Sequence, residues 1–201
     1  MRESLEVIEE RAGVLRGLVQ ELLGFSRSDT GPDEVSLADV VQRIVALQRV
    51  SHGRTVVFEE RILWHDTVVA SAVRVEQILS NLLSNAVDAA PAGRGIVGVT
   101  LWRDGQDAVV EVADNGEGID PELGDRIFEP FVSTKDTEQG TGLGLAICRR
   151  LALAMGGTLS ARNHAEGGAV FELRLPIAAE KADTAARHPM GASTSGEALA
   201  R

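Results

Sequence analysis

Asn81-Leu-Leu-Ser-Asn85-Ala-Val-Asp88 is the first of four short polar or glycine-rich segments that decide the fold. The other three, in chain order, are Asp114-Asn-Gly116-Glu-Gly118-Ile119, Phe128-Glu-Pro-Phe131-Val-Ser-Thr134-Lys135 and Gly140-Thr141-Gly142-Leu143-Gly144. A single glycine-rich segment is usually a turn. Four of them in a mainly apolar stretch of about seventy residues indicate the separate parts of one nucleotide site.

Length and composition restrict the class of protein. The chain has 201 residues and a formal net charge of −10, which suits one core of ordinary size with an appendage. The acidic balance argues against a nucleic-acid partner, because neutralising phosphates needs clustered Lys and Arg. No apolar run is long enough to span a membrane, and no signal-peptide core stands at the N-terminus. Cys148 is the single cysteine, so we expect no internal disulfide and a soluble, cytoplasmic protein.

Residues 3–27 are expected to form one long helix. Their apolar residues recur at alternating steps of three and four, the pattern of a helical bundle seam. Such a stripe needs partner helices, so we expect a homodimer or bundle through this helix; folding back onto the next domain is the alternative. Residues 29–35 are rich in turn formers and predict a linker, whereas residues 178–201 lack periodicity and predict a disordered tail.

Residues 36–177 are expected to form one α/β domain. Helical periodicity predicts three helices, at 36–50, 72–90 and 142–155. Alternating and β-branched runs predict strands at 54–63, 68–69, 96–103, 107–113, 158–162 and 169–175. Together these elements predict a two-layer α/β sandwich, with three helices on one face of a mixed, mostly antiparallel sheet.

The first segment places Asn81, Asn85 and Asp88 at helical spacings of four and three, so their side chains share one helix face. Carboxamide oxygens are hard ligands that suit a hydrated Mg²⁺ bridging phosphates. A solvated polar helix face is the alternative for this trio. The spacing of these three residues is therefore compatible with a magnesium site and equally with a solvated helix face.

The second segment begins with Asp114, at the end of an alternating strand. A carboxylate there can accept a hydrogen bond from an exocyclic amine such as that of adenine. Gly116 and Gly118 would let the backbone lie flat against a purine ring, where a Cβ would collide. An ordinary Asp-Asn-Gly turn is the alternative.

The fourth segment, Gly140 to Gly144, opens a helix, and backbone amides at a helix N-terminus form a phosphate site. It lacks the features of the dinucleotide fingerprint and of the P-loop. The residues before it, including Thr134 and Lys135, have the composition of a mobile lid with a cation that reaches phosphate. Phe128 and Phe131 either clamp the base or belong to the core.

As a set, in this order and spacing, the segments resemble the N, G1, F and G2 boxes of sensor histidine kinases. That family's catalytic domain has the Bergerat-type nucleotide fold shared with gyrase, a heat-shock chaperone and mismatch-repair ATPases. The likeness covers about residues 35–177 and includes Gly167-Gly168-Ala-Val-Phe171. Residues 1–28 look like the second helix of the family's dimerisation and phosphotransfer hairpin. The compact spacing of the last two segments looks most like the nitrogen-regulator type.

The resemblance implies that ATP and Mg²⁺ are the cofactors. Asn85 would coordinate the metal, Asn81 would lie close to the phosphates, and Asp114 would bind the adenine amine. Lys135 and the amides of Gly142–Gly144 would hold the phosphates. The other nucleotide-binding positions it implies are Asp88, Gly116, Gly118, Ile119, Phe131, Thr134, Gly140, Thr141 and Leu143. The family often has a hydroxyl residue where Ala169 stands, so one adenine-side hydrogen bond is expected to be missing.

One position distinguishes reaction types. In the related hydrolysing ATPases the residue at the position of Asn81 is a Glu that activates water, and an Asn cannot act as a base. We therefore expect phosphoryl transfer to a separate nucleophile. In the family the acceptor histidine lies on the other helix of the hairpin, which we expect to lie outside this chain, and we expect the histidines at 52, 65, 164 and 188 at the surface.

The expected partners follow from this reading. They are a helix bearing the acceptor histidine, from a longer parent or from a partner kinase, and a response regulator. Two alternatives stay open. One is a non-catalytic ATP-binding regulatory module that pairs with a full kinase or a response regulator. The other is an anti-sigma-type serine kinase of the same fold, which the Phe128–Lys135 segment and the three-glycine segment make less favoured.

Overall fold

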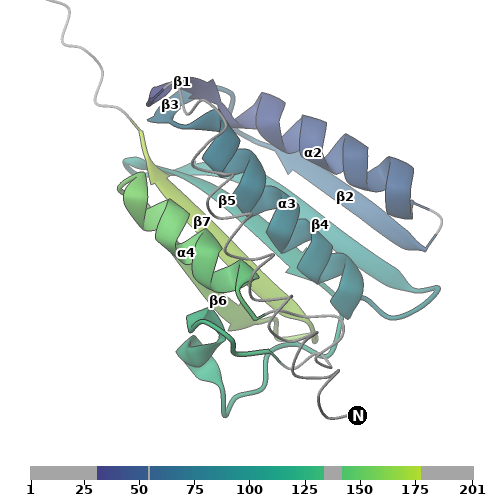
Figure 1. Cartoon of the computed structure of the whole chain (residues 1–201). Coiled ribbons are helices and arrows are strands. Elements are labelled where there is room, and N and C mark those ends of the chain that lie inside the picture. The colour runs from purple at the N-terminus through teal and green to yellow at the C-terminus, as the bar shows by residue number, and fades with distance from the viewer. Residues whose placement is uncertain (1–30, 54, 134–141, 178–201) are drawn as a thin grey trace, which may run out of the picture.

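The computed structural model describes residues 31–53, 55–133 and 142–177. The long helix expected over 3–27 and the tail expected over 178–201 lie outside these ranges. In the described part, three α-helices lie on one face of a five-stranded sheet (Figure 1). None of the helices within these ranges is long and apolar enough to cross a membrane.

The α-helices are α2 (Leu37–His52), α3 (Ala72–Ala89) and α4 (Gly144–Ala154), and η1 (Gly124–Phe128) is a short 3-10 helix. The strands are β1 (Asp33–Ser36), β2 (Val56–Ile62), β3 (Thr67–Ala70), β4 (Gly95–Asp104), β5 (Asp107–Asp114), β6 (Thr158–Asn163) and β7 (Ala169–Pro176). The main sheet has the order β2-β4-β5-β7-β6. Only β2 and β4 are parallel in it, so the predicted mixed, mostly antiparallel sandwich is confirmed.

Two elements differ from the sequence prediction. Strand β1 begins at Asp33, inside the stretch predicted as linker, because it pairs with β3 from Asp33 opposite Ala70 to Ser36 opposite Thr67. Such a short strand depends on a distant partner and leaves little local pattern. The 3-10 helix η1 falls in a stretch where no helix or strand was predicted. In addition, α2 continues to His52, beyond its predicted end at residue 50.

Side-chain caps and apolar stripes explain the first two helices. The Ser36 hydroxyl accepts a hydrogen bond from the Asp39 N–H at 3.2 Å, and the Ser71 hydroxyl accepts one from the Arg74 N–H at 3.4 Å. Such caps satisfy amides that the helix itself leaves without a partner. The apolar stripe of α3 is buried in the core and consists of Val75, Ile78, Leu79, Leu82, Leu83 and Ala86.

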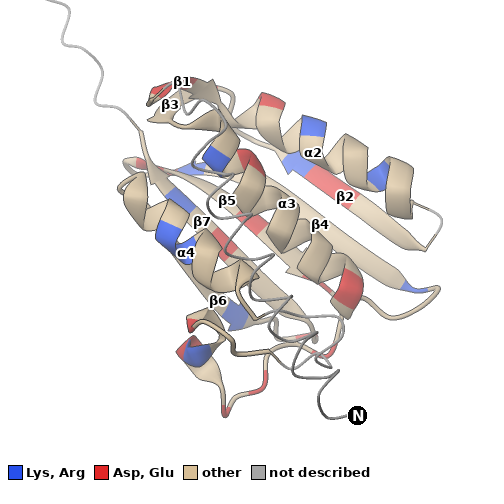
Figure 2. Cartoon of the chain, viewed as in Figure 1, with Lys and Arg blue, Asp and Glu red and all other residues tan. Residues whose placement is uncertain are grey.

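Ion pairs join the strands on the face of the sheet away from the helices. Arg162 of β6 pairs with Glu111 of β5 at 2.8 Å, and Arg174 of β7 pairs with Asp104 at 2.8 Å. Figure 2 shows positive and negative residues interspersed over the helices and strands. Exposed pairs of this kind contribute little to stability. The fold is therefore held mainly by the apolar layer between the helices and the sheet.

The buried thiol of Cys148 in α4 gives a first prediction. Burial raises the pKa of this thiol from its ordinary 9.0 to about 12. We expect the folded chain to resist iodoacetamide at about pH 8.5 and to react in urea, because the reagent attacks the thiolate. Stability should also fall as the pH rises above 9.0, since only the unfolded thiol then loses its proton. Labelling of the folded chain at the rate of a free thiol would contradict this.

Candidate nucleotide-binding site

The polar face of α3 forms one wall of the site. Asn81 and Asn85 are half-buried there, and Asp88 is exposed one turn further on. The Asn85 Nδ2 donates a hydrogen bond to the Asn81 Oδ1 at 3.2 Å, which orients the two carboxamides toward each other. Because the apolar stripe of α3 faces the core, these polar side chains lie on the side turned away from it.

Asp114 forms a second wall and is the one buried carboxylate among the described residues, 7% exposed. Its Oδ1 accepts hydrogen bonds from the Gly116 N–H at 2.8 Å and from the Ala169 N–H at 3.2 Å. Both bonds reach the same oxygen, so the carboxylate is oriented while its Oδ2 accepts no hydrogen bond from the described residues. An oxygen in this position can accept a hydrogen bond from an amine of a ligand.

Close backbone approaches explain the glycines after Asp114. A Cβ on Gly116 would lie 2.4 Å from the Ala89 carbonyl oxygen at the end of α3. A Cβ on Gly168 would lie 1.9 Å from the Asp114 carbonyl oxygen, and this residue has a φ of +90°. The absence of side chains therefore brings the Asp114 loop against both α3 and the start of β7.

The N-terminus of α4 meets α3 in the same way. A Cβ on Gly144 would lie 2.6 Å from the Asn81 Nδ2, so the first residue of α4 lies directly against that carboxamide. Leu143 at the cap position makes no side-chain hydrogen bond to the helix. The first amides of α4 are thus left without a side-chain cap beside Asn81, as expected of a place that receives phosphate.

The two phenylalanines have different surroundings. Phe128 is buried, and the Arg149 guanidinium lies 4.9 Å from the centre of its ring, so this residue belongs to the core. Phe131 is 61% exposed and has a φ of +67°. Its N–H donates to the Gly142 carbonyl oxygen at 2.9 Å, and a Cβ on Gly142 would lie 2.6 Å from the Phe131 carbonyl carbon. The third segment therefore contacts the fourth through backbone.

The structure thus brings the described parts of all four segments together. Thr134, Lys135, Gly140 and Thr141 lie outside the described residues, and their roles stay predictions. Two contributors were missed from sequence. The first is the backbone N–H of Ala169, which donates a hydrogen bond to Asp114. The second is Asn163, whose side chain bonds the backbone of Ile119. Neither has a local sequence signal, because each contact joins distant segments.

The donor set also indicates which metal chemistry fits. Among the described residues, no group of three or more His, Cys, Asp or Glu could hold a metal ion. A metal at this site would instead be bound by few protein oxygens, such as that of Asn85, together with phosphates and water. That is the usual coordination of Mg²⁺ in nucleotide sites. The residues present therefore fit a magnesium ion carried by the nucleotide.

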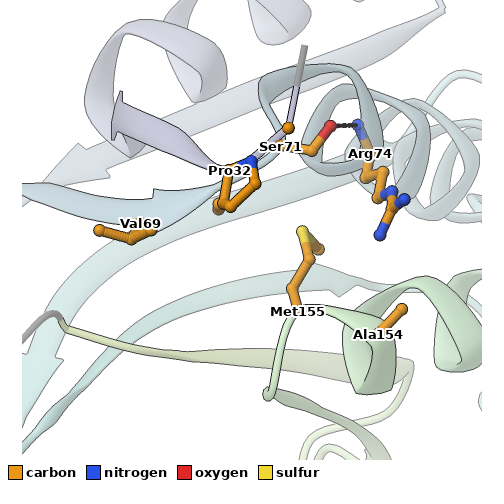
Figure 3. Close-up of a pocket in the computed structure, with 8 residues that line it drawn as sticks. Pro32, Val69, Ser71, Arg74, Ala154 and Met155 are labelled. Carbon is orange, nitrogen blue, oxygen red and sulfur yellow. Dashed lines mark hydrogen bonds between the residues drawn. The ribbon is translucent and has the colours of Figure 1, made fainter. Parts of the chain in front are cut away.

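A separate cavity of about 220 Å³ lies at the other end of the same helices (Figure 3). Its lining comes from the start of the described chain, β3, the N-terminal turn of α3 and the end of α4. Figure 3 labels Pro32, Val69, Ser71, Arg74, Ala154 and Met155 around it. The sequence-predicted residues lie toward the opposite ends of α3 and α4, so this cavity is not part of the candidate site.

Comparison with known proteins agrees with this geometry. The family of histidine kinase-, DNA gyrase B- and HSP90-like ATPases matches residues 70–179, more than half of the chain. The chain belongs to this ATPase family. The matched region contains all four segments, with Asn81, Asp114 and Gly144 among them. Membership of the family therefore agrees with the nucleotide fold predicted from those segments.

Sensor kinases are prominent among the relatives in this family. Sensor protein TorS of Escherichia coli (strain K12) is 35% identical over 189 residues, covering 88% of this chain and 20% of TorS. The chain thus spans about a fifth of that relative. The full-length histidine kinase ShkA in complex with AMPPNP gives a TM-score of 0.66 at 30% identity, covering 87% of this chain and 38% of ShkA.

A third similar protein is histidine kinase ThkA, solved in complex with response regulator protein TrrA. It gives a TM-score of 0.66 at 26% identity, covering 87% of this chain and 50% of ThkA. The predicted resemblance is confirmed: the chain contains a histidine-kinase-like, ATP-binding catalytic domain. The nitrogen-regulator subtype stays a prediction.

Proposed function

We propose that this chain is the catalytic portion of a sensor histidine kinase that transfers the γ-phosphate of Mg·ATP to a histidine on a separate helix. The observation that carries the proposal is the meeting of three groups at one place. These are the carboxamides of α3, the buried carboxylate of Asp114 and the uncapped N-terminus of α4. An adenine, a metal ion and a phosphate chain would each meet a group there that can bind it.

The proposed roles follow from the chemistry of each group. Asp114 would accept a hydrogen bond from the adenine amine, and the amides of Gly142–Gly144 would bind phosphate oxygens. Asn85 would hold Mg²⁺, which neutralises charge on the phosphate oxygens when bound. Lys135 would add a positive charge near them. The chain's contribution is then orientation and charge neutralisation, as is general in phosphoryl transfer.

The choice of acceptor depends on Asn81. Its carboxamide lies against the N-terminus of α4, where the phosphates are proposed to bind, and it cannot remove a proton from water. Without a base at that position, hydrolysis is disfavoured. In the proposed reaction one imidazole nitrogen attacks the γ-phosphorus, the bond to the bridging oxygen breaks, ADP leaves, and the other ring nitrogen gives up its proton.

The proposed partners are a helix with the acceptor histidine, a response regulator and a second copy of the chain through residues 3–27. The solved complex of ThkA with TrrA supports the response regulator, and AMPPNP in ShkA supports the adenine nucleotide. A cytoplasmic location, expected from the sequence, stays a prediction.

Phosphoryl transfer in trans tests the proposal. The chain is incubated with radiolabelled ATP, Mg²⁺ and a helical hairpin that carries an acceptor histidine followed by an acidic residue. We expect acid-labile, base-stable label on the hairpin. A hairpin with His→Gln at the acceptor and a chain with Asp114→Ala are the controls, and both should abolish the label.

Other outcomes identify the alternatives. Nucleotide binding without any label on the hairpin would support the non-catalytic module. Acid-stable label on a serine of a partner would support the serine kinase. Label on a histidine of the chain itself would contradict the proposed separate acceptor.

A further inference from the structure

We propose that Asn163, the last residue of β6, is a positioning residue that holds the adenine-side loop in its binding conformation. This loop, here called the adenine loop, comprises residues Asp114–Ile119. The inference rests on the proposed function, because the adenine role of the loop belongs to that proposal. Asn163 lies outside the four segments and touches the loop from a different strand.

The contact uses both ends of one carboxamide. The Ile119 N–H donates to the Asn163 Oδ1 at 2.6 Å, and the Asn163 Nδ2 donates to the Ile119 carbonyl oxygen at 2.8 Å. The side chain therefore pairs with one residue's backbone as a neighbouring strand would. A carboxamide is the side-chain group that offers an acceptor and a donor side by side. An alanine here would leave both backbone groups of Ile119 to water.

Gly118 is fitted to this contact. A Cβ on Gly118 would lie 2.8 Å from the Asn163 Oδ1, and its φ of +82° is one that side chains rarely adopt. The glycine that was expected to admit a purine ring thus also admits the Asn163 carboxamide. A glycine is therefore favoured at position 118 both by the expected purine ring and by the Asn163 side chain.

The start of the loop is held in the same manner. The Asn115 Oδ1 accepts a hydrogen bond from the Ile96 N–H at 2.8 Å, and its Nδ2 donates to the Arg94 carbonyl oxygen at 2.9 Å. Asn115 therefore fastens the loop to the beginning of β4, and Asn163 fastens its end to β6. Between these two contacts lies Glu117, which is exposed.

Because the Asn163 side chain is exposed, its role is to position the loop and not to pack in the core. Asn163 is exposed, so removing its side chain opens no cavity, and exposed hydrogen bonds contribute little to global stability. A loop released at one end must instead be ordered when the ligand binds. That cost lowers the affinity rather than the stability.

The test compares Asn163→Ala with Arg162→Ala, which removes the ion pair to Glu111 from the neighbouring position of the same strand. Affinities are measured by calorimetry for ADP and for a non-hydrolysable ATP analogue with Mg²⁺. We expect Asn163→Ala to weaken both by the same factor, about tenfold, because both ligands share the adenosine. Arg162→Ala should stay within about twofold, and the urea midpoints of both variants should match that of the wild type.

Amide hydrogen exchange at Ile119, measured without nucleotide, reports the contact itself. We expect faster exchange in Asn163→Ala and unchanged exchange in Arg162→Ala. Asn163→Asp keeps the size and one acceptor but puts a carboxylate oxygen against the Ile119 carbonyl oxygen, and it should therefore also weaken the binding of both nucleotides. This second variant keeps the test decisive if the alanine variant folds poorly.

The outcomes separate the two proposals. A wild-type chain that binds neither nucleotide would overturn the proposed function, whatever the exchange at Ile119 shows. A wild type that binds, with Asn163→Ala equal to it within about twofold, would overturn the positioning role alone. A loss of affinity matched by an equal loss of urea stability would also overturn it, since the residue would then be merely structural.

Discussion

Replacing Asn85 by alanine is expected to abolish Mg²⁺-dependent ATP binding while leaving the fold intact. Asn85 is the proposed metal ligand, and losing even a residue that only supports a metal ligand typically weakens metal binding by about 10- to 100-fold. The residue is half-buried on the polar face of α3, and alanine favours helix, so the free energy of unfolding should not fall. Displacement of a fluorescent ATP analogue, with Mg²⁺ and with chelator, measures the effect.

Ser84→Ala is the matched control for this variant. Ser84 is the exposed neighbour of Asn85 on the same helix and lies outside the proposed site residues. We expect it to bind Mg·ATP as the wild type does. ATP affinity in Asn85→Ala that equals the wild type in the presence of Mg²⁺ would count against the metal assignment.

Among glycine-to-alanine changes in the described part of the domain, Gly168→Ala should lower the stability most. The added Cβ would meet the Asp114 carbonyl oxygen at 1.9 Å, in a residue with a φ of +90°. Backbone strain and the clash together should lower the free energy of unfolding by roughly 3 kcal/mol. The clash would also push the start of β7 outward and move the Ala169 N–H away from Asp114. Nucleotide affinity should therefore fall as well. Urea unfolding with and without nucleotide measures both effects.

Gly167→Ala introduces the same kind of backbone strain without the clash. Gly167 has a similar φ of +100°, but a Cβ there would find its nearest neighbour 3.9 Å away, at the Gly116 carbonyl oxygen. Only the cost of the left-handed backbone applies, about 1 kcal/mol. Equal destabilisation by the two variants would show that the close approach of Gly168 to Asp114 has been overstated.

Local patterns predicted most of the architecture. The apolar stripe of α3 and the alternating residues of β4 and β5 are buried as their periodicity requires. The Ser36 hydroxyl caps α2 at the residue where that helix was predicted to begin. These features depend on neighbours within one or two turns of the chain, which a sequence displays directly.

Contacts between segments distant in the sequence could not be predicted from local patterns. Strand β1 exists because Asp33–Ser36 finds β3, and the adenine loop is held by Asn163 from 44 residues away. No periodicity records such pairings. The two phenylalanines show the same limit: Phe128 is buried and Phe131 exposed, although both stand in one short motif. The candidate site was predictable in its segments and not in the contacts that join them.

The amide spectrum of the isotopically labelled chain, recorded with Mg²⁺ and a non-hydrolysable ATP analogue, tests the central claim most directly. That claim is that α3, the adenine loop and the N-terminus of α4 form one nucleotide site. We predict that the largest shifts fall on Asn85, Gly116 and Gly144, while Val69 and Met155 beside the separate cavity stay unchanged. Largest shifts around that cavity, or no shifts at all, would contradict the claim.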